Sequence, residues 1–239
     1  MSSRAQDLVY LAMVYQSIQK YCIALNCLQE AFEIDRGLIR EKSSLIGCIL
    51  KTAIDPIRDS IKTIQNYLDN SGSSEMAGFN DALNTSIMKS RAEIDNLCEN
   101  GFSLIKKCLE TDMGSETTAF FNKLQGDLFR YRCEQGIQLE ESLKNAQSFY
   151  LKAIEMAQRD LSLAHPVRLG TVLNYAVFLY EHLDKYEEAI LNLTSSAEDA
   201  THLINELSEN SQNESQTIIE VMRSNLQNWS VDSSDEEDI

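Results

Sequence analysis

The run KLQGDLFRYR gathers three cations, Lys123, Arg130 and Arg132, around one tyrosine in a chain that is otherwise strongly acidic. Lys123 and Arg130 are seven residues apart, so on a helix they share one face, with Asp127 between them as a brace for both. Tyr131 adds a neutral hydroxyl donor, because a phenol keeps its proton far above pH 7. Such donors suit the oxygens of an anion such as a phosphate. The run therefore predicts a local anion site.

An earlier segment repeats this spacing. Lys51 and Arg58 are also seven residues apart, and Lys62 follows one turn later. Two helices thus each offer a basic pair at matching spacing. On periodicity alone the pattern is more typical of two solvated helix faces, because exposed lysines and arginines usually have no ligand.

The overall charge limits the kinds of partner. The 239 residues include 37 Asp and Glu against 21 Lys and Arg, for a formal net charge of −16. Nucleic acids and anionic membranes both require a positive protein surface. We therefore expect no nucleic-acid partner and no membrane partner, and any anion site must be local.

The elements that carry these residues are expected to be helices. Apolar residues recur every three and four positions, and the chain has only 9 Gly and 2 Pro for tight turns. We predict an all-α fold of nine antiparallel helices, stacked in sequence order as a curved array similar to tetratricopeptide repeats, with a concave amphipathic groove. The nine helices are expected at residues 5–17, 20–34, 38–69, 77–109, 115–137, 141–161, 167–183, 186–206 and 213–228.

The ends of the helical region are marked by composition. A Gly- and Ser-rich segment, NSGSSEMAG at 70–78, is expected to separate the third helix from the fourth. After Trp229 the periodic pattern stops, and SVDSSDEEDI at 230–239 contains five acids and no base. Such a segment is expected to be disordered when alone. We predict one helical domain over 1–229 and an acidic tail over 230–239.

Residue types that support catalysis or metal binding are sparse. The six cysteines and three histidines show no zinc-ligand spacing, and there is no glycine-rich phosphate loop or nucleophile motif. We expect no cofactor, no metal site and no enzymatic activity, with the cysteines as buried reduced thiols. No apolar run approaches the roughly 18 residues of a membrane span, so we expect a soluble, cytoplasmic protein.

Three motifs, FFNKLQGDLFRYR, AHPVRLGTVLNYAVFLYE and MRSNLQNW, resemble the most recognisable motifs of the 14-3-3 family, in the family's order and at close to its spacing. The resemblance runs from Leu8 to Trp229 and is strongest over 120–229. It implies a non-catalytic adaptor that binds phosphoserine or phosphothreonine segments of client proteins in a basic, amphipathic groove.

The resemblance also implies roles for individual residues. The phosphate pocket falls on Lys51, Arg58, Arg130 and Tyr131, with Lys123 at its edge. The residues implied to hold the bound peptide, mainly by its backbone, are Asn174, Asn225, Glu181 and Trp229. The apolar wall of the groove falls on Leu173, Val177, Val221 and Leu226.

Some positions depart from the family pattern. Pro56 lies inside the third predicted helix, where a kink would shift Lys51 relative to Arg58. Thr217 and Asn228 are polar where the apolar wall usually has aliphatic residues. We therefore do not carry over a preferred ligand sequence.

Family members dimerise through their first four helices. Lys20 and Glu93 match one bridging pair, but Ile23 replaces the acid expected to meet Lys89. One partly exposed ion pair contributes only about 0–1 kcal/mol, so apolar burial can compensate for its loss. We predict a homodimer, with a heterodimer left open, and expect the apolar contacts at Val14, Ile18, Ile64 and Tyr67.

Two further interpretations stay open. SFYLKAIEMA at 148–157 and DKYEEAILNL at 184–193 are 36 residues apart, near the roughly 34-residue period of tetratricopeptide repeats. They favour an alternative function, a helical-repeat scaffold that binds unphosphorylated, acidic protein segments. Independently, the acidic tail at 230–239 is a candidate to dock in the basic groove of its own chain or of a neighbouring one.

Overall fold

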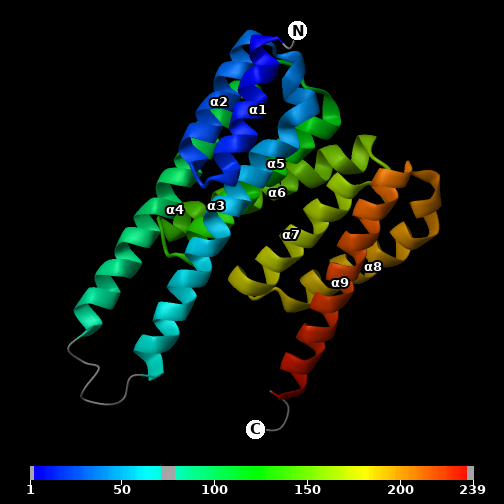
Figure 1. The fold of residues 1–239 in the computed structure, drawn as a ribbon. Coiled ribbons are helices and arrows are strands. Elements are labelled where there is room, and N and C mark those ends of the chain that lie inside the picture. Colours follow the sequence, from blue (N-terminus) through cyan, green and yellow to red (C-terminus); the bar gives the residue numbers. More distant parts are fainter. Residues whose placement is uncertain (1–2, 71–78, 236–239) are drawn as a thin grey trace. The chain divides into compact units, whose positions relative to one another are not determined.

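The computed structural model describes residues 3–70 and 79–235, with side chains described as far as Ser230. Over these residues the chain forms nine α-helices, one short 3-10 helix and no strand, so the predicted all-α fold is confirmed. None of these described helices is both long and apolar enough to cross a membrane. The helices are α1 Arg4–Ser17, α2 Tyr21–Ile34, α3 Gly37–Asn70, α4 Asn80–Cys108, α5 Gly114–Glu134, α6 Leu139–Asp160, α7 Pro166–His182, α8 Tyr186–Leu203, η2 Ile204–Glu206 and α9 Glu209–Asp235 (Figure 1).

The last helix is the one that differs most from its predicted bounds. Helices α1 to α8 begin and end within three residues of prediction, whereas α9 begins at Glu209 and continues to Asp235. The predicted end of the last helix at residue 228 is wrong, because α9 continues to Asp235. Extending an existing helix costs little free energy, because the helix is already nucleated, and residues 230–235 contain no Gly or Pro that would end it. Residues 236–239 and most of the predicted 70–78 connection lie outside the described part of the chain.

Helix α3 continues through Pro56, from Gly37 to Asn70. A proline cannot donate a backbone bond to the carbonyl of Thr52, one turn earlier. The turn that follows gains a side-chain bond instead, because the Ser60 hydroxyl donates to the Pro56 carbonyl at 2.8 Å. Lys51 and Arg58 therefore remain on one continuous helix.

The chain forms two compact units, one made of residues 1–113 with 131–142 and the other of 114–130 with 143–239. In the first unit α1 packs on α2, α2 packs on α3, and α3 packs on α4. Fully buried aliphatic side chains form its core. The largest are Leu28, Ile39, Ile46, Ile49, Leu50, Ile54, Ile94 and Ile105.

In the second unit α7, α8 and α9 pack against one another. Its largest fully buried side chains include the aromatic residues Phe121, Tyr150 and Phe178. Gly126 permits a close approach to one of them, since a Cβ at this position would lie 2.8 Å from the Tyr150 ring. Glycine at this position of α5 therefore lets the Tyr150 ring pack directly against the helix backbone.

The cysteines follow their prediction only in part. Cys98, Cys108 and Cys133 are buried, but Cys22 and Cys48 are exposed, so the prediction of burial is wrong for these two. Both lie on outward faces of amphipathic helices, where composition alone does not decide the orientation. Burial raises the pKa of the Cys98 and Cys108 thiols to about 12.

Candidate functional site

In the first unit, Arg58 of α3 and Tyr131 of α5 lie together. The guanidinium carbon of Arg58 is 4.7 Å from the centroid of the Tyr131 ring, a cation–π contact. Arg58 Nε donates to Glu134 Oε2 at 2.5 Å, and Arg58 Nη1 donates to Asp55 Oδ1 at 2.9 Å. One aromatic ring and two carboxylates therefore orient the guanidinium.

Lys51 lies on the same helix as Arg58. It is exposed, seven residues before Arg58 and four before Asp55, which places all three on one face of α3. Lys62, one turn beyond Arg58, is also exposed. The first unit thus carries the predicted basic pair of α3 together with two acids that neutralise part of its charge.

In the second unit, Asp127 of α5 is the centre of a buried network. Its Oδ2 accepts a bond from Lys123 Nζ at 2.8 Å, as the four-residue spacing predicts. Its Oδ1 accepts bonds from the Tyr150 hydroxyl and from Asn174 Nδ2, both at 2.7 Å. Arg130, buried on the same helix, bonds to the Tyr150 hydroxyl.

The ionisation states of this network follow from its partners. Burial alone would raise the pKa of Asp127, but the charges of Lys123 and Arg130 and the bonds from Lys123 and Tyr150 leave that pKa below its ordinary value. Burial, followed by the charge of Asp127, raises the pKa of Tyr150 well above its ordinary value. Asp127 is therefore a fixed acceptor and Tyr150 a fixed donor near neutral pH.

The residues predicted to contact a peptide backbone lie on α7 and α9, which pack against each other. Asn174 and Glu181 belong to α7, while Val221, Asn225 and Trp229 follow at four-residue intervals on one face of α9. Trp229 is buried and stacks on Tyr180, with ring centroids 4.2 Å apart. Most of its surface is therefore used in packing α9 against α7.

The predicted apolar wall differs in exposure along its length. Leu173 is buried, Val177 and Leu226 are half-buried, and Val221 is exposed. Thr217 and Asn228 are exposed on α9, and the Thr217 hydroxyl donates back to the Asn213 carbonyl at 3.0 Å.

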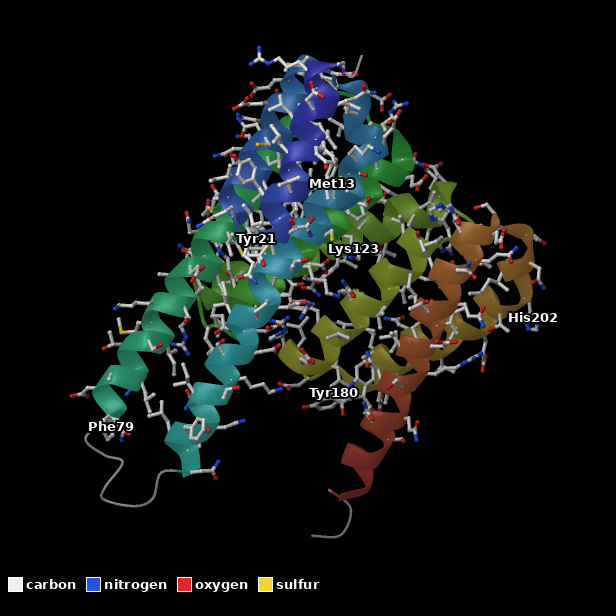
Figure 2. All side chains as sticks on the ribbon, in the orientation of Figure 1. Met13, Tyr21, Phe79, Lys123, Tyr180 and His202 are labelled. Atoms are coloured by element: carbon white, nitrogen blue, oxygen red, sulfur yellow. The ribbon has the colours of Figure 1, made fainter. Side chains whose placement is uncertain are left out.

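The residues predicted for a dimer contact all lie in the first unit. Val14, Ile18 and Tyr67 are exposed, and Ile64 is half-buried. The charged residues of the predicted contact, Lys20, Lys89 and Glu93, are also exposed. Further exposed apolar side chains on the first four helices are Tyr10, Leu11, Met13, Ile23, Ile34 and Met88, and Phe79, just before α4, is also exposed. Figure 2 labels Met13 and Phe79.

Arg132 does not serve as an anion ligand although it lies in the basic run. It is buried in the first unit, where its guanidinium bonds to Asp95 and Glu99 of α4 and lies 5.3 Å from the Phe102 ring centroid. Two positions along a helix turn a side chain by about 200°, away from the face of Arg130. Arg132 therefore joins α5 to α4.

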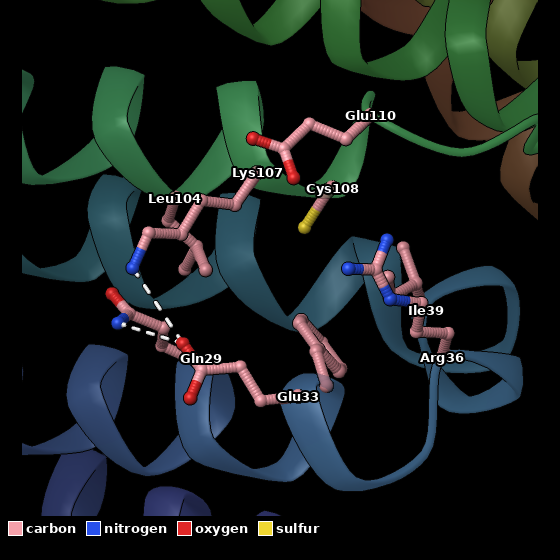
Figure 3. A pocket seen from close by; sticks show the side chains of 9 residues that line it. Gln29, Glu33, Arg36, Ile39, Leu104, Lys107, Cys108 and Glu110 are labelled. Carbon is pink, nitrogen blue, oxygen red and sulfur yellow. Dashed lines mark hydrogen bonds and ion pairs between the residues drawn. The ribbon is translucent and has the colours of Figure 1, made fainter.

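A hollow of about 170 Å³ opens elsewhere in the first unit, between the end of α2, the start of α3 and the end of α4 (Figure 3). Phe32, Ile39 and Leu104 contribute apolar lining, and Lys107 pairs with Glu33 at 3.6 Å. No residue predicted for the phosphate site lines this hollow. Its cations are balanced by acids, so it offers no concentrated positive charge.

Three residues of these clusters were not predicted from the sequence. Asp55 could have been found, because it precedes Arg58 by three residues on a helix. Glu134 and Tyr150 could not, because their partners lie 76 and 23 residues away in the chain.

The chain as a whole is similar to known proteins. The family model described as 14-3-3 protein matches residues 11–230. The chain belongs to the 14-3-3 family. Among its relatives, the 14-3-3-like protein GF14 epsilon of Arabidopsis thaliana is 28% identical over 244 residues, which cover 100% of this chain and 95% of the relative.

Two other relatives of this 14-3-3 protein come from distant organisms. The checkpoint signal transducer rad24 of Schizosaccharomyces pombe is 27% identical, with 95% of this chain and 85% of the relative covered. The 14-3-3 protein theta of Gallus gallus is 26% identical, with 97% of this chain and 95% of the relative covered. The relationship therefore spans nearly the whole chain and is divergent in sequence.

Proposed function

We propose that this 14-3-3 protein is a non-catalytic, cytoplasmic adaptor that binds phosphoserine or phosphothreonine segments of client proteins. The observation that carries the proposal is the family match over residues 11–230, which includes both basic clusters. By that match, the proposed phosphate ligands are Lys51, Arg58, Arg130 and Tyr131, with Lys123 at the edge of the site.

The chemistry of these side chains explains how phosphorylation controls binding. A phosphoserine brings about −1.5 to −2 charges and three acceptor oxygens. Each charge-assisted hydrogen bond to it contributes about 1.5–3 kcal/mol. An unmodified serine offers a guanidinium one neutral hydroxyl acceptor and no negative charge, so it competes poorly with the carboxylates that already bind Arg58.

The remaining groove residues give contacts that depend little on the client's sequence. Asn174 and Asn225 each carry a donor and an acceptor, so they are suited to the N–H and C=O groups of an extended peptide. The apolar wall of Leu173, Val177, Val221 and Leu226 is proposed to contact side chains beside the phosphorylated residue, with Glu181 and Trp229 nearby.

A titration with one peptide in phosphorylated and unphosphorylated forms tests this function. Fluorescence anisotropy should show binding of the phosphorylated form only, and Arg130→Ala should abolish it. Arg159→Ala is the matched control, because Arg159 is an exposed arginine paired with Asp160 on α6. Equal affinity for both peptides would instead favour a scaffold that binds unphosphorylated segments.

We also propose that the protein is a homodimer. Exposed apolar residues on the first four helices, including Val14, Ile18 and Tyr67, supply surface whose burial against a second copy would be favourable. Light scattering in dilute solution should give about twice the chain mass of 27.1 kDa. A mass near that of one chain would contradict the dimer and leave phosphopeptide binding by the single chain untouched.

A further inference from the structure

We infer that Tyr150 is a positioning residue for ligand binding, which holds a phosphate-binding group and a peptide-binding group in a fixed relation through its hydroxyl. The inference rests on the proposed function, because it assigns Arg130 to the phosphate and Asn174 to the peptide backbone. Tyr150 lies on α6 and belongs, like Arg130, Asp127 and Asn174, to the second unit.

Tyr150 does not touch a ligand itself. Its side chain has 0% exposure, and its ring is enclosed by the rings of Tyr175 and Phe178, at 5.9 and 5.7 Å between centroids. Gly126 of α5 adds a third wall, because any Cβ there would collide with the same ring. The position of the hydroxyl is therefore set by packing on three sides.

The hydroxyl connects two groups that have different proposed tasks. It donates to Asp127 Oδ1 at 2.7 Å and accepts a bond from Arg130. The same Asp127 oxygen accepts the amide N–H of Asn174, also at 2.7 Å. A rotation of Asp127 would thus move Asn174, and the Tyr150 hydroxyl resists that rotation while it holds Arg130 from the other side.

The buried setting gives this arrangement its rigidity. Asp127 and Arg130 are both buried, so neither can replace a lost partner with bulk water at no cost. A phenylalanine at position 150 would keep the packing and remove only the link. Asp127 would keep Lys123 and Asn174 as donors, whereas Arg130 would lose the hydroxyl acceptor.

The test compares Tyr150→Phe with Tyr175→Phe. Tyr175 is a matched control, since it is also buried and touches the same ring cluster, but its hydroxyl bonds to Gln147 rather than to Asp127. We expect Tyr150→Phe to weaken phosphopeptide binding about fivefold to tenfold, within the range of one ordinary intramolecular hydrogen bond, and Tyr175→Phe to change it less than about twofold. Thermal unfolding of both variants shows that each is folded.

Two further readouts separate positioning from a general structural role. In a double-mutant cycle, Tyr150→Phe should weaken binding by a smaller factor in an Asn174→Ala background, because the two side chains act through Asp127. In the protein without ligand, the side-chain amide resonances of Asn174 should shift in Tyr150→Phe and stay unchanged in Tyr175→Phe.

The outcomes distinguish this inference from the proposed function. Suppose that the wild type binds only the phosphorylated peptide. Equal Kd values for the two phenylalanine variants, or full additivity of the Tyr150→Phe and Asn174→Ala effects on binding, then overturn the role of Tyr150 and leave the proposed function intact. If the wild type does not discriminate the two peptides, the proposed function fails. In that case the Asn174 amide resonances of Tyr150→Phe decide the inference. Unchanged resonances overturn it, and shifted resonances show that Tyr150 positions Asn174 although the protein does not select phosphopeptides.

Discussion

Arg58 and Asp127 each form a charged hydrogen-bonded cluster on a long helix, but in opposite environments. The side chains of Arg58 and Asp55 are 28% and 32% exposed, so water reaches both partners of that ion pair. Asp127 has 6% side-chain exposure, and its partner Tyr150 has none. The same chemistry therefore occurs once at a surface and once in a core.

The difference in environment changes what each cluster can do. An exposed pair is stabilised by about 0–1 kcal/mol, so a ligand of higher charge can displace one partner. A buried charge that loses a partner costs about 3–5 kcal/mol, so its partners are effectively permanent. The Arg58 cluster is suited to exchanging a carboxylate for a phosphate, and the Asp127 network is suited to holding geometry.

The largest expected effect comes from removing the centre of the buried network. Asp127→Ala leaves Lys123, Tyr150 and Asn174 without their common acceptor and should lower the free energy of unfolding by about 3 kcal/mol. Urea unfolding at pH 7 measures this change. Asp160→Ala, which removes an exposed carboxylate on α6, is the control and should change stability little. Similar losses in the free energy of unfolding for Asp127→Ala and Asp160→Ala would contradict the special role of the buried network.

A smaller effect is expected from crowding Tyr150. Gly126→Ala places a Cβ 2.8 Å from the Tyr150 ring, and the strain should exceed the gain in helix propensity, with a net destabilisation of about 1 kcal/mol. Gly170→Ala is the matched control on α7, where the nearest atom to the new Cβ, Lys123 Cε, lies at an ordinary 3.6 Å. That variant should be neutral or slightly stabilising. Thermal unfolding of both proteins compares them directly.

The buried network should also show a defined pH dependence. The folded-state pKa of Asp127 is lowered, so its ionised form stabilises the fold fully above the unfolded-state pKa of about 4. This contribution is lost as the pH falls through the lower, folded-state pKa. The stability difference between wild type and Asp127→Asn should therefore be constant from pH 7 to 5 and shrink at more acid pH. A difference that grows on acidification would contradict the assignment.

The smallest expected effect concerns the partly exposed Arg58 cluster. Asp55→Asn removes a carboxylate that competes with a ligand for Arg58 Nη1, so phosphopeptide affinity should rise by up to about fivefold, equivalent to about 1 kcal/mol. Asp69→Asn makes the same charge change at an exposed position eleven residues beyond Arg58, about three turns further along α3, and should alter the affinity less. If both variants bind equally well, Asp55 does not compete for Arg58.

The sequence could predict what depends on neighbouring residues. Apolar spacing located α1 to α8 within three residues, because a helix face is defined by positions three and four apart. The same spacing indicated the Lys123–Asp127 pair, and it could have indicated Asp55 and Arg58. The end of α9 was missed, because polarity was taken as disorder in a segment that continues an existing helix.

By itself, then, the sequence determined the helices, the acidic exterior, the family, and the residues that share a helix face. Only the tertiary structure decided that Arg132 bonds to α4, that two carboxylates hold Arg58, and that Tyr150 and Asn174 share one oxygen of Asp127. The physical reason is the distance along the chain between the interacting residues. Helical periodicity relates residues within about one or two turns, whereas Asp127 meets partners 23 and 47 residues away only after the helices have packed.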